Sequence, residues 1–180
     1  MNLVATTMTP AEYDKLPSNP RVELVDGVVH VMPPATRLHQ EIVDALKITL
    51  SRLRPSDLVV VREQELRLRD DHRRNPDLMV IDGAADDPSR YSFTPDEVVL
   101  AIEVVSPGTE TIDRMHKHAE YCNARVPHYW RVEIRPKVTI HTYQLGETGV
   151  YLETGAFEPG DTVAAPGLAW AKVAVSDLVP

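Results

Sequence analysis

Two apolar runs of strand length dominate the hydrophobic pattern of this chain, and each carries a carboxylate. The first run follows Asn75-Pro76 and begins with Asp77, and the second covers residues 98–105 with Glu103 inside it. Because nearly every other position of both runs is apolar, we expect two strands that are covered on both faces. A carboxylate in such a strand is costly to bury unless a cation or a full set of hydrogen-bond donors meets it.

Helical periodicity appears before and after these two runs. Apolar residues recur at spacings of three and four over residues 36–53, which predicts a long amphipathic helix. A second helix is predicted over residues 109–123, with a buried stripe of Ile112, Met115, Ala119 and Cys122. Thr9 and Glu12 form a capping-box pattern that predicts a short helix at the start of the chain.

Alternating patterns predict the other strands. Asp26-Gly27 lies between two alternating runs, which is a strong signal for a β-hairpin. Further strands are predicted at residues 58–62, 65–69, 128–133, 137–144 and 151–154, whereas residues 70–74 read as a polar turn. Helices interspersed with strands predict an α/β fold in which helices pack against a mixed sheet.

Composition narrows the class of protein. At 180 residues we expect a single domain. The net charge of −8 argues mildly against broad affinity for nucleic acid, because phosphate binding depends on clustered Lys and Arg. The single cysteine, Cys122, suits a reducing compartment, and neither a secretory signal nor a membrane-length apolar stretch is present. These features predict a cytoplasmic protein.

The two strand carboxylates suggest a site for a divalent metal if their strands are neighbours. Lys117 follows on the second predicted helix, and a divalent metal with a lysine suggests hydrolysis of phosphodiesters. Glu23 is a candidate third acidic ligand. Asp113 shares a helix face with Lys117 at i, i+4 spacing, and His39 lies near the start of the long helix.

The order of short motifs along the chain resembles the Uma2 family. The residues that carry the likeness are Arg21-Val22-Glu23-Leu24-Val25-Asp26-Gly27, Met32-Pro33-Pro34, His39, Pro76-Asp77, Glu103-Val104-Val105-Ser106-Pro107, Asp113, Lys117, Tyr121 and Val126-Pro127-His128-Tyr129-Trp130. The likeness covers residues 13–132. It implies a bacterial restriction endonuclease-like protein of the PD-(D/E)xK nuclease superfamily, with a nuclease core over residues 13–144 and a mixed β-sheet flanked by helices.

The resemblance also implies roles for individual residues. Asp77 matches the Asp of the Pro-Asp half of the motif, Glu103 the acidic residue of its second half, and Glu23 the acidic residue of the N-terminal part. The implied cofactor is Mg²⁺ or Mn²⁺ and the implied substrate is DNA. The strict motif would place a lysine at position 105, where this chain has Val105, and Lys117 is the match in the following helix.

Several alternatives stay open at this stage. Asp77 also reads as a strand cap, Glu23 as the partner of an arginine and Lys117 as part of a solvated face, while Tyr121 and Trp130 read as core aromatics rather than base-stacking platforms. The arginines between positions 52 and 74 form either a DNA-binding zone or an ordinary mixed-charge surface. A nuclease-fold binding module with little or no turnover competes with the active nuclease, and RNA is a further substrate class. A homodimer is expected from fold analogy alone.

Overall fold

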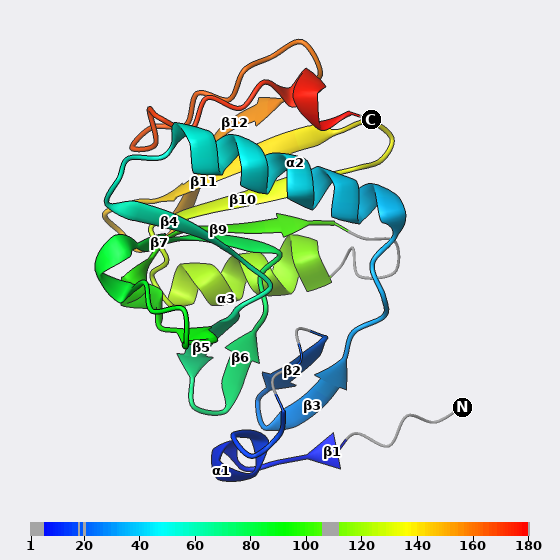
Figure 1. The fold of residues 1–180 in the computed structure, drawn as a ribbon, viewed down its shortest axis with the longest axis vertical. Coiled ribbons are helices and arrows are strands. Elements are labelled where there is room, and N and C mark those ends of the chain that lie inside the picture. The colour runs from blue at the N-terminus through cyan, green and yellow to red at the C-terminus, as the bar shows by residue number, and fades with distance from the viewer. Residues whose placement is uncertain (1–5, 18, 20, 106–111, 180) are drawn as a thin grey trace.

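The strands of the protein form two six-stranded mixed sheets. A computed structural model describes residues 6–17, 19, 21–105 and 112–179, without the side chains of residues 112 and 113. The sequence pattern predicted an α/β fold with a mixed sheet, which is confirmed, but the strands divide between two sheets rather than one (Figure 1).

One sheet has the longer strands, and we call it the larger sheet. It holds both of the apolar strands that the sequence pattern indicated. Its order is β12 (Tyr151–Phe157), β11 (Thr139–Leu145), β10 (His128–Glu133), β9 (Val98–Val104), β7 (Leu78–Asp82) and β4 (Leu58–Arg62). β9 and β10 are parallel, and the other neighbours in this sheet are antiparallel. The predicted adjacency of the two carboxylate-bearing strands is therefore confirmed, because β7 pairs with β9.

The smaller sheet contains the predicted hairpin. Its order is β1 (Thr6–Thr7), β3 (Val28–Val31), β2 (Val22–Val25), β6 (His72–Arg74), β5 (Glu65–Arg69) and β8 (Ser92–Phe93). Asp26 and Gly27 both adopt positive φ, at 51° and 75°, as the tight turn of a two-residue hairpin requires.

Two helices begin after threonine caps, the first of which was predicted from its capping box. Thr9 caps α1 (Pro10–Tyr13) in a complete capping box with Glu12, and Thr36 caps α2 (Arg37–Leu53). Short 3₁₀ turns lie at Gly83–Ala85, Pro95–Glu97 and Val175–Leu178. Every helix among the described residues is too short or too polar to cross a lipid bilayer.

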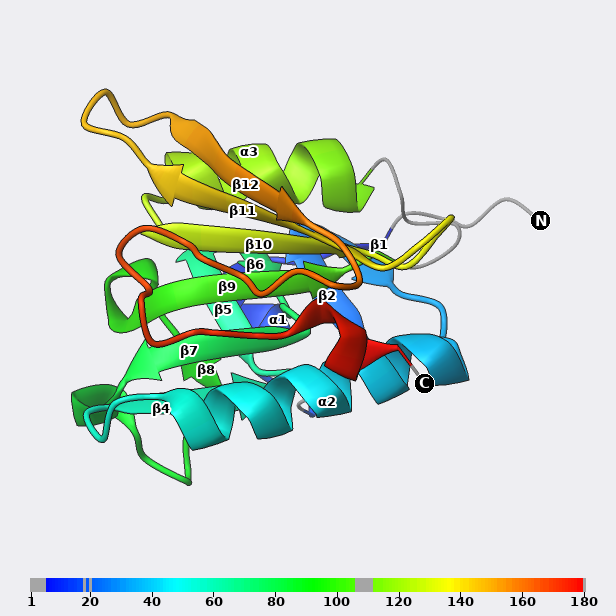
Figure 2. The same cartoon turned by 90° about the horizontal axis from the view of Figure 1, so that it is seen from above.

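The larger sheet is buried on both faces, as its apolar runs predicted. One face packs against α2 and the C-terminal segment, with Leu46, Leu78 and Ile102 among the buried residues. The other face packs against α3 (Lys117–Asn123) and the smaller sheet, with Met79 and Tyr129 among its buried residues. Figures 1 and 2 show α2 and α3 on opposite sides of this sheet.

The polar segment at residues 70–74 is not a simple turn, so that prediction was wrong. His72, Arg73 and Arg74 form strand β6, and all three side chains are buried. The hydrophobic pattern gave no sign of this strand because it contains no apolar residue. Its side chains are buried through ion pairs with acidic residues from elsewhere in the chain.

The predicted buried stripe of the second helix was also wrong in part. Residues Ile112–His116 form a π-helical turn ahead of α3, Met115 is 66% exposed and Ala119 is exposed. Cys122 is buried as predicted, and Lys117 and Tyr121 are buried in place of Met115 and Ala119. A π-turn adds a residue to one turn of the helix, so the face that points inward differs from the one that regular α-helical spacing predicts.

Candidate active site

The antiparallel register of β7 and β9 places Asp77 next to Glu103. Leu78 pairs with Ile102 and Met79 with Ala101, so the same register continued by one residue sets Asp77 opposite Glu103. Directly opposed residues of an antiparallel pair extend their side chains from the same face, with Cβ atoms roughly 5 Å apart. The two carboxylates predicted from separate apolar runs therefore lie on one face of the sheet.

Asp77 is held through one of its two carboxylate oxygens. Oδ2 accepts a hydrogen bond from the backbone N–H of Val104 at 2.7 Å, and Nε2 of His39 lies 3.2 Å from the same oxygen. Among the residues that the structure describes, none donates a hydrogen bond to Oδ1. This arrangement fixes the orientation of the carboxylate and leaves Oδ1 able to accept another ligand.

Glu103 lies in a buried, polar environment. Its Oε2 accepts a hydrogen bond from Nζ of Lys117 at 2.8 Å, and its Oε1 accepts one from the hydroxyl of Tyr121 at 2.6 Å. The side chains of Glu103 and Lys117 are 2% and 6% exposed, so this is a buried ion pair. Burial, and then the negative charge of Glu103, raise the pKa of Tyr121 well above its usual value, which keeps this hydroxyl protonated and donating.

α3 brings Lys117 and Tyr121 to the same carboxylate. The two residues are four apart in the helix, so they occupy one face, and this face packs against β9. The solvated surface position that the sequence also allowed for Lys117 is not what the structure shows. Tyr121 is a core aromatic, as predicted, but its hydroxyl contacts the site through Glu103.

Glu23 reaches the same region from β2, where its carboxylate already has two partners. Oε2 accepts a hydrogen bond from Arg74 at 2.7 Å, and Oε1 accepts one from the backbone N–H of Asn75 at 3.0 Å. Arg74 also binds both carboxylate oxygens of Glu120 at 2.7 Å. Although burial opposes ionisation, hydrogen bonds from His72 and Arg74 lower the pKa of Glu120 to about 2. The arginine partner that the sequence analysis left open for Glu23 is therefore Arg74.

One cavity unites the predicted residues. Glu23, His39, Asp77, Glu103 and Lys117 all line a cavity of about 290 Å³ between the two sheets and the start of α2. Arg21, Glu63 and Asn75 are further lining residues that the sequence analysis did not assign to the site. Asp113 was predicted as a supporting residue, and its side chain lies outside the described residues.

The donor set suits a cation that takes few protein ligands. Within the described part of the chain, no three His, Cys, Asp or Glu side chains lie close enough together to hold a metal ion. Mg²⁺ usually binds one or two carboxylates and keeps several waters, so Asp77 and Glu103 alone fit this ion. Glu23, which was predicted as a third acidic ligand, forms no such group of three with Asp77 and Glu103, and its oxygens accept hydrogen bonds from Arg74 and Asn75; the ligand role stays a prediction.

The arginine-rich zone is largely neutralised by acidic partners. Arg73 is 2% exposed and pairs with Asp14, while Arg69 pairs with Asp26 and Asp71. Of the two readings left open for these arginines, the mixed-charge surface describes Arg69, and Arg73 and Arg74 are internal ion-pair residues. The hydrophobic pattern could not reveal that Arg73 and Arg74 are buried, because both are charged. Their place just before Pro76-Asp77 in the sequence did put them near the site.

Comparisons with known proteins agree with the fold and identify the family. The model of the Uma2 family, described as "Putative restriction endonuclease", matches residues 10–176. The crystal structure of a putative nuclease of DUF820 from Anabaena variabilis ATCC 29413 superposes with a TM-score of 0.70, at 19% sequence identity, over 95% of this chain and 97% of that one. The comparison with curated proteins found no significant match. Because the family model spans nearly all of the described residues, this chain belongs to the Uma2 family of restriction endonuclease-like proteins.

Proposed function

We propose that this protein is a divalent-metal-dependent endonuclease that hydrolyses phosphodiester bonds of DNA. The observation that supports the proposal most strongly is the convergence of Asp77, Glu103 and Lys117 on one cavity. The two carboxylates come from neighbouring strands and the lysine comes from a helix that packs against one of them. Membership of a restriction endonuclease-like family makes a nucleic acid the natural substrate.

In this proposal Asp77 and Glu103 hold one Mg²⁺ or Mn²⁺ ion. A bound divalent ion would polarise the phosphoryl group and lower the pKa of a coordinated water. Oδ1 of Asp77 accepts no hydrogen bond from any described residue, which leaves it available for this role. Glu103 would contribute the second carboxylate ligand from its buried position beside Lys117.

Lys117 supplies the positive charge of the site. Its ammonium group, 2.8 Å from Oε2 of Glu103, compensates the carboxylate and lies where it can orient a water or meet the charge that develops on the phosphate. This side chain extends from α3, whereas position 105, where the strict motif has lysine, is a buried valine. Tyr121 fixes the second oxygen of Glu103, which limits the orientations open to this carboxylate.

His39 and Glu23 are positioning residues in this account. Nε2 of His39 lies 3.2 Å from Oδ2 of Asp77 and so fixes the orientation of this carboxylate from the side away from Oδ1. Glu23 links the site wall to Arg74 and to the backbone of Asn75, two residues before Asp77. We assign Glu23 to the support of the site rather than to the metal.

A cleavage assay tests the proposal. Plasmid and single-stranded DNA are incubated with Mg²⁺ or Mn²⁺ and with wild type, Asp77→Asn or Glu103→Gln. Glu41→Gln is the matched control, because Glu41 pairs with Arg37 on the exposed side of α2. Metal-dependent cleavage by wild type and the control, with loss in both site variants, supports the proposal. Cleavage that persists in both site variants contradicts it.

A nuclease-fold binding module is the second candidate, and the valine at position 105 favours it. Such a module would bind DNA or RNA without metal-dependent turnover. A gel-retardation assay beside the cleavage assay separates the two candidates. A wild-type protein that cleaves no DNA but still retards a single-stranded oligonucleotide in the gel supports the binding module. RNA in place of DNA tests the remaining substrate class, and linearisation rather than nicking of plasmid would indicate paired sites in a homodimer.

A further inference from the structure

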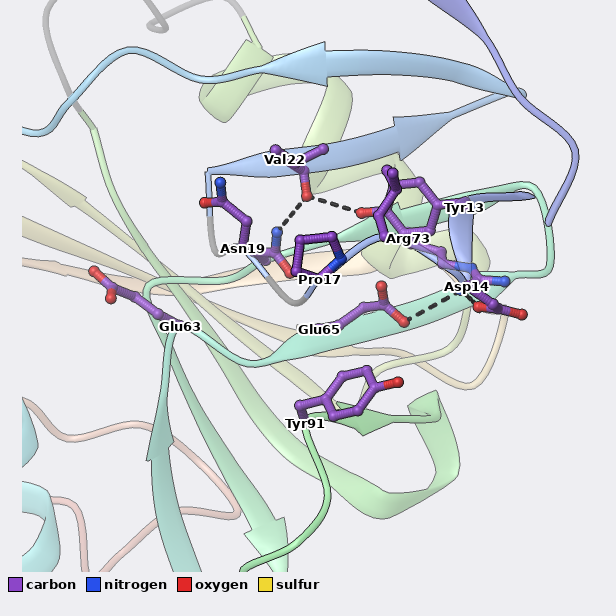
Figure 3. Close-up of a pocket in the computed structure, with 11 residues that line it drawn as sticks. Tyr13, Asp14, Pro17, Asn19, Val22, Glu63, Glu65, Arg73 and Tyr91 are labelled. Atoms are coloured by element: carbon purple, nitrogen blue, oxygen red, sulfur yellow. Dashed lines mark hydrogen bonds and ion pairs between the residues drawn. The ribbon is translucent and has the colours of Figure 1, made fainter. Parts of the chain in front are cut away.

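A second cavity adjoins the proposed active site. It measures about 190 Å³, several times the roughly 30 Å³ that one water occupies in the liquid. Asn19, Glu63 and Asn75 line both cavities, so the two share a wall. Figure 3 shows this second cavity with its lining residues. A group that enters it would therefore lie beside whatever occupies the space around Asp77 and Glu103.

The shared wall is tied directly to the proposed metal ligand. Glu63 adopts a left-handed backbone conformation with φ of 50°, which is uncommon for a residue other than glycine. Its backbone N–H donates a hydrogen bond to the carbonyl oxygen of Asp77 at 3.2 Å. Such costly conformations concentrate where ligands are bound.

The second cavity offers flat, accessible faces to a planar ring. Tyr91 lines the cavity and is 55% exposed, and the ring of Pro17 lines the cavity as well. In Figure 3 the carboxylate of Glu65 lies between these two rings in the view. Aromatic side chains on accessible surfaces are the usual platforms on which single-stranded bases stack.

Glu65 supplies an acceptor at this position. Its side chain is 11% exposed, and its Oε1 accepts a hydrogen bond from Ser92 at 2.8 Å and lies 3.7 Å from Arg73. No described residue donates a hydrogen bond to its Oε2, so this oxygen can accept one from a ligand. A carboxylate can only accept hydrogen bonds, which selects for a ligand with an N–H donor.

The charge of the cavity excludes a phosphate. Among its described lining residues, Asp14, Glu63 and Glu65 stand against one cation, Arg73, whose guanidinium already binds Asp14 and the carbonyl oxygen of Asp70. The excess of negative charge would repel an anion and attract a neutral donor. The larger cavity is also lined by carboxylates, but it has two cations, Arg21 and Lys117, and the divalent ion of the proposed function would add to their charge, so the phosphate of a nucleotide would lie there.

We propose that this second cavity binds an unpaired nucleobase of the substrate strand that carries an exocyclic amino group, next to the phosphodiester held in the active-site cavity. The base stacks on Tyr91 and donates its amino N–H to Oε2 of Glu65. The proposal rests on the proposed function, since it takes the ligand of the neighbouring cavity to be a nucleic acid. It predicts a preference for cytosine over thymine, whose only Watson–Crick-edge donor is a ring N–H and whose other groups are acceptors.

Binding without catalysis tests this proposal. Affinities are measured by fluorescence anisotropy, at fixed salt and with EDTA, for labelled single-stranded oligonucleotides of deoxycytidine, of thymidine and of abasic residues. Wild type should bind the cytosine strand more tightly than the thymine strand, and the abasic strand most weakly. Tyr91→Ala should weaken binding of the cytosine strand by about five- to a hundredfold and leave the abasic strand unchanged, whereas Tyr91→Phe should retain the affinity.

Glu65→Gln provides the specificity readout. The amide of glutamine can donate as well as accept, so this nearly isosteric variant should lose the preference for cytosine and gain affinity for thymine. A merely structural role of Glu65 would weaken all three strands alike. Equal binding of the three strands by wild type, no binding of any, or an equal loss for the abasic strand in Tyr91→Ala would overturn the proposal. Because no metal is present, these outcomes are separate from the loss of cleavage in Asp77→Asn that tests the proposed function.

Discussion

The backbone N–H of Val104 donates a 2.7 Å hydrogen bond to Oδ2 of Asp77, which ties the carboxylate of one strand to the residue that follows Glu103 on the next. The bond offsets part of the cost of partly burying Asp77 and fixes which oxygen remains available. The spacing of the two carboxylates is thus set by the sheet itself rather than by a loop. Rigid placement of this kind is what a metal site on a scaffold requires.

Removal of the lysine from its buried pair should affect both activity and stability. Lys117→Met leaves the carboxylate of Glu103 buried without its cation, so we expect loss of metal-dependent cleavage and a decrease of roughly 3–5 kcal/mol in the free energy of unfolding. Urea denaturation measures the second effect. Lys15→Met, on an exposed side chain, is the control and should leave stability nearly unchanged. The double variant Lys117→Met/Glu103→Leu should regain stability but no cleavage.

His39 should act through Asp77 rather than on the substrate. His39→Leu removes the group 3.2 Å from Oδ2 of Asp77, so Mn²⁺ affinity measured by isothermal titration calorimetry should fall about 10- to 100-fold. His39→Gln places an amide N–H where the imidazole Nε2 lies, and it should recover most of this affinity. Equal Mn²⁺ affinities of the leucine variant and wild type would remove His39 from the account.

The ion-pair network behind the site should be structural. Arg74 contacts Glu23 and Glu120 at 2.7 Å, and Arg74→Met would leave the buried carboxylate of Glu23 without its cation and Glu120 with His72 alone. We expect a loss of roughly 3–5 kcal/mol in the free energy of unfolding. Arg69→Met is the matched control, because its exposed pairs with Asp26 and Asp71 should contribute less than about 1 kcal/mol. Similar losses in both variants would contradict the assignment.

The same network gives stability a defined dependence on pH. The carboxylate of Glu120, against the opposing effect of burial, raises the pKa of His72, and Asp26 adds to the shift. A raised pKa means that protonated His72 stabilises the fold fully below its unfolded pKa of about 6.5, and that this contribution is lost as pH rises through the higher folded pKa.

The difference in unfolding free energy between wild type and His72→Gln measures this contribution directly. It should be largest below pH ~6.5 and should shrink as pH rises above that value. Subtraction of the variant removes the effect of His118 and His128, whose pKa values burial lowers and whose contributions therefore have the opposite sign. A difference that stays constant or grows with rising pH would show that the pKa of His72 is not raised in the folded protein.

Apolar patterning predicted the parts of the site that lie on regular strands. Glu103 interrupts an apolar run and Asp77 begins one, so the burial of Glu103 and the place of Asp77 at the end of a buried strand were visible in the sequence, and the pairing of β7 with β9 places them together. The hairpin at Asp26-Gly27 was predictable because few residues tolerate the positive φ of its turn.

Features that depend on charge pairing or on helix register were not predictable from periodicity. Strand β6 consists of His72, Arg73 and Arg74, whose burial depends on acids that are distant in sequence, such as Glu23 and Asp14. The π-helical turn before α3 exposes Met115 and buries Lys117, and regular spacing gives no sign of it. The role of Lys117 therefore came from its match to the family motif and not from the helix pattern.

Soaking a crystal of the protein in Mn²⁺ and recording anomalous scattering shows whether Asp77 and Glu103 bind a divalent ion. We expect an anomalous peak within the cavity that Asp77 and Glu103 line, with oxygens of both carboxylates as its protein ligands and Glu23 still bound to Arg74. A cavity that stays empty at saturating Mn²⁺, or an ion held by other residues while Asp77 and Glu103 stay uncoordinated, would contradict this expectation.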